Sequence, residues 1–259
     1  MTPVFDAYAA YYDLLYKDKD YAGEAQFVFD LLNKHGVGTG KILELGCGTG
    51  KHAEHLARLG YGVHGVDMSP AMVESANARK PAEFFDRLKF EVGDVRTAKV
   101  DGEFDAVISL FHVASYQTRN EDIAAMFRTV ASHLKEGGLF IFDCWYGPAV
   151  LTDRPTVRVK RMQGDTFDVL RIAEPVMHPN ENVVDVNYTV QVTGTSDGRV
   201  TQFQETHRMR YLFAPEIQLF LELAGMRQIL MVEWLTGAIT GFDTWAAAFI
   251  AVKGNKWAL

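Results

Sequence analysis

Five short apolar segments recur along the first 142 residues, and more polar, helical patterns separate them. These segments are residues 42–45, 62–66, 88–92, 104–110 and 139–142. Between the first two, His52, Leu56 and Leu59 repeat at helical spacing. Strands that are apolar throughout are typical of a sheet that helices cover on both faces. The alternation therefore predicts an α/β fold with a Rossmann-like, mostly parallel sheet.

The period of the pattern changes after residue 150. Apolar and polar residues alternate, as in strands, over residues 156–211, and turn residues interrupt them at 179–182 and 193–198. This pattern predicts three or four antiparallel strands. We expect them to form a β subdomain, residues 151–211, that is inserted after the fifth strand on the acceptor side.

The last 45 residues return to the first pattern. Pro215 opens a helix that extends to Ala224, and Gly225 ends it. Residues 226–235 and 246–252 then read as two more strands, which we expect to form an antiparallel pair. They complete a seven-stranded sheet, with a core domain made of residues 37–150 and 212–259.

An aromatic-rich helical region, about residues 5–34, precedes the first strand. The polar break at 17–20 favours two helices over one, and Tyr12 and Tyr16 lie four residues apart on one helix face. These tyrosines either pack against the core or belong to a lid, residues 1–36, whose hydroxyl groups reach a ligand. The sequence leaves both interpretations open.

Composition and charge narrow the class of protein. The 259 residues are 48% hydrophobic and 23% charged, which suits one globular domain with an insertion. The net charge of −7 argues against a broad nucleic-acid surface. No apolar run is long enough to span a bilayer, no signal-peptide pattern opens the chain, and Cys47 and Cys144 have no metal-type spacing. We expect a cytoplasmic monomer or homodimer that binds no membrane, metal or nucleic acid.

A glycine loop follows the first strand directly and opens a helix. The motif is Glu44-x-Gly46-x-Gly48-x-Gly50. Glycines let the backbone approach a ligand, and a helix start favours an anionic group. A dinucleotide-binding loop of the form G-x-G-x-x-G would need its third glycine at position 51, where Lys51 stands. A nicotinamide-dependent oxidoreductase is therefore disfavoured.

Acidic residues follow the next two strands. Asp67 ends the second strand beside the glycine loop, and Ser69 already supplies the cap of the next helix, so Asp67 is free to hold a ribose diol. Asp94 follows the third strand in a Gly-Asp turn. His112 lies in the loop after the fourth strand, where loops at the carboxyl edge carry function.

These motifs, in this order, resemble class I S-adenosylmethionine-dependent methyltransferases, and the likeness covers most of the chain. It implies S-adenosylmethionine as the cofactor and S-adenosylhomocysteine as the product. The methionine carboxylate would lie at the loop amides, Glu44 would hold the amino group, Asp67 the ribose, and Asp94 with the Val95 amide the adenine. The cofactor-binding residues that the resemblance implies are Tyr12, Tyr16, Glu44, Gly46, Cys47, Gly48, Thr49, Gly50, Asp67, Met68, Asp94, Val95 and Leu110.

Three features resemble a narrower, small-molecule group that includes N-methyltransferases acting on nucleotide-linked amino sugars. They are Tyr12-Asp13-Leu14-Leu15-Tyr16, the inserted strands and the stretch 207–213. The chain departs from the sugar enzymes after the fifth strand, where residues 142–145, Phe-Asp-Cys-Trp, replace the expected Glu-Pro-Trp-Trp. The acceptor, and whether its nitrogen or its oxygen is methylated, therefore stay open. A protein that only senses S-adenosylmethionine is a further alternative.

Methyl transfer from a sulfonium mainly requires an acceptor lone pair held in line with the breaking bond. We expect His112 and Tyr16 to be the catalytic residues, His112 also as a base for a hydroxyl acceptor. His112, Trp145 and Tyr146 would bind the acceptor. Arg158 and Lys160 alternate onto one strand face. This basic face either binds an anionic acceptor or is only the solvated side of an edge strand.

Overall fold

The fold is taken from a computed structural model, which describes residues 16–254, so Tyr12 lies outside the described residues. Five parallel strands lie side by side in the order β3-β2-β1-β4-β5, and two antiparallel strands extend the core sheet, β11 beside β5 and then β10. These strands are β1 (Lys41–Leu45), β2 (Gly62–Asp67), β3 (Leu88–Val92), β4 (Phe104–Ser109), β5 (Leu134–Tyr146), β10 (Met226–Glu233) and β11 (Ala246–Lys253). The expected α/β fold and the final antiparallel pair are confirmed.

Helices cover both faces of this core sheet because alternate strand residues point to opposite sides. Ile42 and Ile141 pack with α2 (Tyr21–Lys34), α3 (Lys51–Arg58) and α4 (Pro70–Arg79) on one face. Phe140 and Phe142 pack with the helices of the other face. The remaining helical elements are α5 (Asn120–His133), α6 (Gly147–Thr152), α7 (Ala214–Leu223) and the 3-10 turns η1 (Ala82–Phe84) and η2 (Val113–Tyr116).

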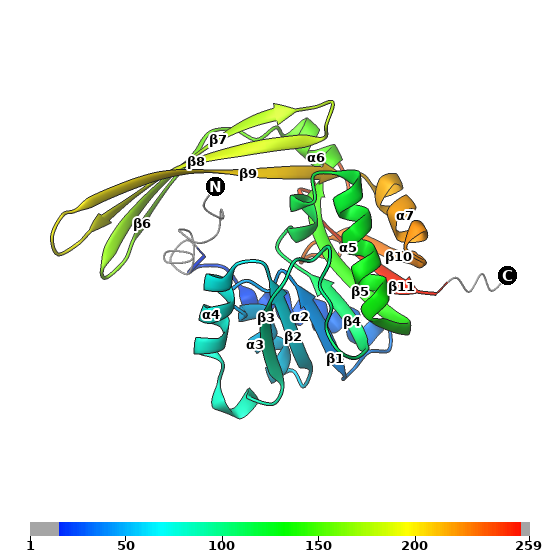
Figure 1. Cartoon of the computed structure of the whole chain (residues 1–259). Helices are drawn as coiled ribbons and strands as arrows, with labels where there is room; N and C mark the ends of the chain where they lie inside the picture. The colour runs from blue at the N-terminus through cyan, green and yellow to red at the C-terminus, as the bar shows by residue number, and fades with distance from the viewer. Residues whose placement is uncertain (1–15, 255–259) are drawn as a thin grey trace.

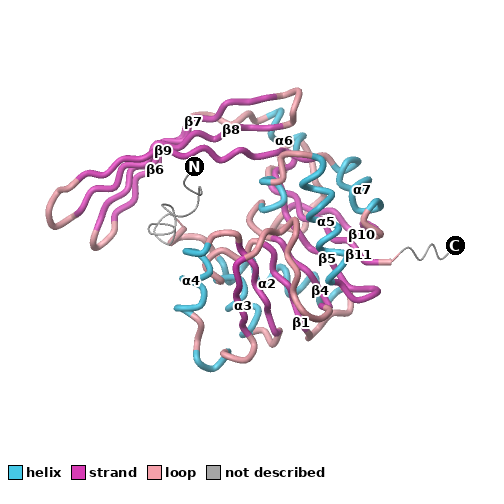
Figure 2. The backbone as a smooth tube through the Cα atoms, in the orientation of Figure 1, coloured by secondary structure: helices cyan, strands magenta, loops and turns pink. Residues whose placement is uncertain are grey.

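Four long antiparallel strands form the insertion, which we call the arm. They are β6 (Arg158–Gln163), β7 (Phe167–His178), β8 (Val183–Gly194) and β9 (Val200–Leu212). The arm projects from the core past the ends of the core strands (Figure 1), and Figure 2 shows that strands and tight turns make up almost all of it.

The sheet has eleven strands rather than the seven expected for the core, because the arm is hydrogen-bonded to it. The end of β9 pairs in parallel with the end of β5, with Trp145 opposite Tyr211 and Tyr146 opposite Leu212. This joint is possible because β5 continues to Tyr146, well beyond the apolar segment that marked it in the sequence. Within residues 16–254, no helix is both long and apolar enough to cross a membrane.

Candidate active site

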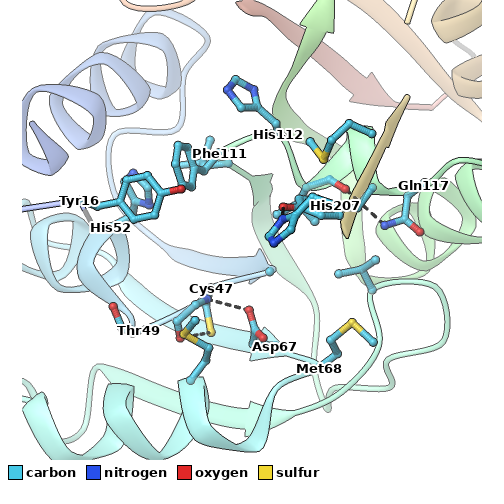
Figure 3. Close-up of a pocket in the computed structure, with 18 of the residues that line it drawn as sticks. Tyr16, Cys47, Thr49, His52, Asp67, Met68, Phe111, His112, Gln117 and His207 are labelled. Atoms are coloured by element: carbon cyan, nitrogen blue, oxygen red, sulfur yellow. Dashed lines mark hydrogen bonds between the residues drawn. The ribbon is translucent and has the colours of Figure 1, made fainter. Parts of the chain in front are cut away.

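A pocket of about 380 Å³ lies between the carboxyl edge of the parallel strands and the arm. Its core side comes from the glycine loop, the ends of β2 to β5 and η2, and its arm side from Val186, Tyr188, His207 and Met209. Figure 3 shows His207 and Gln117 on one side of the space, with Tyr16 and His52 across from them. The sequence-predicted residues that line the pocket are Tyr16, Gly46, Cys47, Gly48, Thr49, Asp67, Met68, Asp94, Val95, Leu110, His112 and Trp145.

The glycine loop brings its backbone to the pocket through three left-handed residues. Gly46, Gly48 and Gly50 have φ of 80°, 52° and 76°. A Cβ at Gly46 would lie 2.5 Å from Val113 Cγ2, whereas a Cβ at Gly48 would meet nothing within 4 Å in the described chain. Gly50 caps α3 and does not line the pocket, since a Cβ there would lie 2.8 Å from the Phe90 ring. Gly48 is thus the glycine that leaves open space beside a ligand.

The loop amides differ from the expected carboxylate cradle. The Gly46 and Cys47 amides donate to Val66 O at 2.7 and 3.1 Å, and the Gly50 amide donates to Cys47 O at 3.0 Å. The Gly48 amide donates to Asp67 Oδ2 at 2.8 Å (dashed in Figure 3). Four of the five amides are therefore paired within the protein. The loop supplies close approach and shape rather than a set of open donors.

Asp67 stands where the sequence placed it, at the end of β2 beside the glycine loop. Its carboxylate also accepts the Ser69 amide at 2.9 Å, while the Ser69 hydroxyl accepts the Met72 amide and caps α4. Burial raises the pKa of Asp67, and the bonds from Ser69 and Gly48 oppose that shift. Two protein donors orient the carboxylate, and it lines the pocket, as a ribose acceptor requires.

We expect Asp67→Asn to weaken S-adenosylmethionine binding by about 10- to 100-fold. An acceptor bond from a charged carboxylate is worth about 1.5–3 kcal/mol, and the amide is uncharged. Titration calorimetry measures the change. Ser69→Ala is the control, because it removes the α4 cap next door, at about 1 kcal/mol of stability, and is expected to leave the affinity unchanged. Equal affinities for Asp67→Asn and the unaltered protein would contradict the ribose role.

Glu44 lies beneath the pocket, 1% exposed and not in its lining. Its Oε2 has no hydrogen-bond partner among the described residues, and its Oε1 is 3.7 Å from His52 Nδ1. Burial, with a smaller contribution from the charge of Asp67, raises the pKa of Glu44 to about 8. A buried acid with an orphan oxygen fits a cationic partner, such as the amino group of S-adenosylmethionine.

A chain of buried charges connects Glu44 to the segment before α2. His52 Nε2 lies 2.6 Å from Glu24 Oε2, and Glu24 also pairs with Lys19. Burial lowers the pKa of His52, and Glu24 only partly opposes that shift. Because His52 thereby favours its neutral form, it supplies no full counter-ion to a Glu44 carboxylate, which agrees with the raised pKa of Glu44.

Asp94 lines the pocket, but its carboxylate is engaged by an arginine. Arg96 Nε donates to both Asp94 oxygens at 2.9 and 3.1 Å, and Arg96 Nη1 donates to Asp122 at 2.8 Å. The Arg96 guanidinium holds the pKa of Asp94 below its usual range. The expected adenine contact therefore depends on the remaining lone pairs of Asp94, beside the Val95 backbone.

The loop after β4 is strained where it meets the pocket. Phe111 and His112 have φ of 64° and 63°, a conformation that costs a non-glycine residue about 1–3 kcal/mol. Asp143 supports it, since its carboxylate accepts the His112 amide at 3.1 Å and lies 2.7 Å from His112 Nδ1 at ion-pair distance. Asp143 is 1% exposed. It was missed as a site residue, although an acid at the end of an apolar strand was the available signal.

Tyr16 both packs and lines the pocket, so the two interpretations of this residue are compatible. Its ring meets Phe111 edge-on at 5.0 Å and joins a cluster with Met72 of α4 and Met162 of β6. It therefore lies where the core and the arm come together. A direct role in cofactor binding or catalysis stays a prediction.

The two acceptor-binding residues expected at the end of β5, Trp145 and Tyr146, lie on opposite faces of the sheet. Trp145 lines the pocket, with its ring 6.4 Å from His112, but Tyr146 packs against the core cluster on the opposite face. Consecutive strand residues point to opposite sides, so both residues cannot line one pocket. Tyr146 is therefore not a wall of the acceptor pocket.

Arg158 and Lys160 are exposed on β6, the outermost strand of the arm, and do not line the pocket. Their face is nevertheless the one that turns toward the core, because it also carries the buried Met162. Their role in acceptor binding stays a prediction.

Tyr116, His207 and Tyr188 line the pocket and were not predicted. Tyr116 Oη lies 2.6 Å from His207 Nδ1, and the Tyr188 ring meets His207 edge-on at 5.0 Å. Strand alternation offered a signal, since His207 lies two residues from the apolar Met209 on the same face of β9. Among the described residues, no group of three or more His, Cys, Asp or Glu side chains is arranged to hold a metal.

Comparison with known proteins agrees with this geometry. Residues 42–138 match a family described as a methyltransferase domain. The chain is 30% identical over 237 residues to dTDP-3-amino-3,4,6-trideoxy-alpha-D-glucopyranose N,N-dimethyltransferase of Streptomyces venezuelae, covering 90% of this chain and 94% of that one.

Solved structures share the whole architecture. The crystal structure of Streptomyces venezuelae DesVI superposes with a TM-score of 0.79 at 25% identity, covering 95% of this chain and 98% of that one. CalS10, an amino pentose methyltransferase from Micromonospora echinaspora solved with S-adenosylmethionine bound, has the same fold, with a TM-score of 0.75 at 23% identity and coverages of 98% and 99%. The chain therefore belongs to the S-adenosylmethionine-dependent methyltransferases and is an enzyme that uses S-adenosylmethionine as its methyl donor.

Proposed function

We propose that this enzyme methylates the amino nitrogen of a nucleotide-linked amino sugar. The observation that carries the proposal is the pocket itself. The arm forms one side of it with the polar side chains of Tyr188 and His207, beside a surface made basic by Arg158, Lys160 and Arg171. The relative from Streptomyces venezuelae, whose length the chain almost fully covers, is named for a dTDP-linked amino sugar and for N,N-dimethylation. We extend that class of acceptor to this chain.

The residues of the core fit a bound S-adenosylmethionine. Glu44 would hold the amino group and Asp67 the ribose hydroxyls, and the open side of Gly48 would let the backbone approach the cofactor. When bound, S-adenosylmethionine supplies a methyl group already activated by its sulfonium. The protein then has to hold the acceptor nitrogen in line and exclude water, and the arm residues Val186 and Met209 provide apolar cover.

The arm supplies positive charge on the face that turns toward the core. Lys160 of β6 is directly opposite Arg171 of β7, and Arg158 is opposite Ala173. Residues directly opposite each other on neighbouring strands lie on one face of the sheet, so Lys160 and Arg171 add positive charge to the same face of the arm. The Arg171 guanidinium also lies 4.8 Å from the ring centroid of Tyr188, which lines the pocket. This basic surface leads from the pocket toward the outer strand, as a sugar with an attached diphosphate would require.

Arg158→Ala combined with Lys160→Ala is expected to raise KM for the nucleotide-linked acceptor by about 10-fold or more, with kcat and S-adenosylmethionine affinity unchanged. Each lost charge-assisted bond to a phosphate is worth about 1 kcal/mol or more. Steady-state kinetics measure the change. Arg161→Ala is the matched control, because Arg161 is exposed on the opposite face of the same strand. An equal rise in KM for Arg161→Ala would show that the net charge of the arm matters and that the position of Arg158 and Lys160 does not.

The acceptor class is tested by incubating the enzyme with the dTDP-linked amino sugar of the Streptomyces relative and deuterated methyl donor. Mass spectrometry of the product locates the label and counts the transfers. Label on nitrogen supports the proposal, and no transfer to the amine overturns it. Label on a sugar hydroxyl would instead favour oxygen transfer, for which His112, supported by Asp143, is the base in place.

A further inference from the structure

Transfer to an amine has a requirement that the cofactor residues do not meet. An alkyl amine is largely protonated near neutral pH, and its nitrogen then has no lone pair for attack. After a first transfer the product nitrogen carries a positive charge and must lose a proton before a second transfer. A proton acceptor on the acceptor side of the pocket would serve both steps. This requirement rests on the proposed function.

A chain of titratable groups leads away from the pocket on that side, from the partly buried Tyr116 to the buried His207. Tyr116 of η2 lines the pocket, and its hydroxyl lies 2.6 Å from His207 Nδ1. His207 Nε2 lies 3.3 Å from Glu205 Oε1, and both side chains are 6% exposed. His207 and Glu205 are two residues apart on β9, so the strand places them on one face.

The groups around Tyr116 favour a relay in which its phenol passes a proton on but does not itself stay ionised. Burial raises the pKa of Tyr116 well above its usual range, and Tyr16, Tyr188 and Glu205 add to the shift while Arg171 opposes it. The hydroxyl therefore stays protonated. Tyr188 packs against His207 from β8, and Arg171 of β7 lies over Tyr188. Glu205 is the carboxylate of this group and can stabilise an imidazolium.

We propose that Tyr116, His207 and Glu205 form a proton relay that deprotonates the acceptor amine. One N–H bond of the ammonium breaks, and the nitrogen keeps the electron pair that later attacks the methyl group. The proton passes to Tyr116 Oη while the Tyr116 hydroxyl proton passes to His207 Nδ1. His207 becomes an imidazolium held against the Glu205 carboxylate, and it later releases a proton to water.

A hydrogen bond between η2 and β9 would also hold the arm to the core, so loss of activity alone does not separate the two roles. The dependence on pH does. The experiment compares Tyr116→Phe, His207→Gln and Glu205→Gln with the unaltered enzyme from pH 6.5 to 9.5, with saturating amine acceptor. For the relay we expect kcat to fall about 10- to 100-fold at pH 6.5, within the usual contribution of a positioned acid or base. The loss should shrink at pH 9.5, where the amine loses its proton unaided.

The second readout is the ratio of dimethylated to monomethylated product, which should fall in all three variants at low pH. S-adenosylmethionine affinity should stay unchanged. His178→Gln is the matched control, because His178 forms a comparable pair with Asp185 on the arm, at 2.8 Å, without lining the pocket.

A loss of kcat that is the same at every pH would overturn the relay and leave a structural role. If His207→Gln does not fold, Tyr116→Phe decides, since it keeps the ring and removes only the hydroxyl. Failure of the unaltered enzyme to methylate any amine is a different result, and it overturns the proposed function rather than the relay.

Discussion

Glu44→Gln is expected to weaken S-adenosylmethionine binding by about 30- to 1000-fold, or about 2–4 kcal/mol. The change removes the carboxylate charge from a buried site, where losing one partner of an ion pair is costly. Titration calorimetry at pH 8 measures it. Glu54→Gln is the control, because Glu54 lies on the surface of α3 in a pair with Arg58. A change of less than 3-fold for Glu44→Gln would remove Glu44 from the cofactor site.

The same substitution is expected to stabilise the ligand-free protein at high pH. The pKa of Glu44 is about 8 in the folded chain against a reference value of 4.5, so folding favours the protonated form. The stability that this protonation contributes is complete below pH 4.5 and is lost as the pH rises through 8. Glutamine does not titrate.

Melting experiments without ligand should therefore show that the free energy of unfolding of Glu44→Gln, relative to that of the unaltered protein, rises between pH 6 and pH 9. The expected rise is on the order of 2–4 kcal/mol. Parallel stability curves would show that Glu44 does not titrate in this range. A gain in stability together with a loss of binding would show that burial of Glu44 destabilises the free protein, whereas Glu44 contributes to binding the cofactor.

Gly46→Ala is expected to destabilise the protein by about 2–5 kcal/mol, a fall in Tm of roughly 5–15 °C for a chain of this size. The left-handed φ of 80° costs an alanine about 1–2 kcal/mol, and the new methyl group would lie 2.5 Å from Val113 Cγ2. Thermal melting measures the loss. An unchanged Tm would mean that the loop has room to rearrange.

Gly48→Ala tests the role of the loop in cofactor binding with little effect on the stability of the fold. Its added methyl group meets no atom of the described chain within 4 Å, so only the backbone cost of about 1 kcal/mol remains. The methyl group does occupy the open side of the loop, and we expect S-adenosylmethionine affinity to fall at least 10-fold. Gly102→Ala, at φ 97° with open space and away from the pocket, is the control for the backbone cost alone.

Local patterns were enough to predict much of this enzyme. The alternation of apolar segments with helical spacing identified the parallel sheet, because burial on both faces leaves that mark on each strand. The sequence also predicted the separate roles of Asp67 and Ser69, because Asp67 ends a strand and Ser69, two residues later, caps a helix. The spacing of Gly46, Gly48 and Gly50 from Glu44 identified the cofactor through resemblance.

The tertiary structure decided the features that depend on residues far apart in the chain. Asp143 supports His112 across 31 residues, and Tyr116 reaches His207 across 91. Both contacts follow from strand order and from the way the arm joins β5, which no local period encodes. Tyr146 points away from the pocket because strand alternation separates it from Trp145, and only the structure showed which of the two faces the pocket. The pKa of Glu44 and the pairing of the loop amides likewise depend on what surrounds each group after folding, because burial and donors, not spacing, set the energy of a charge.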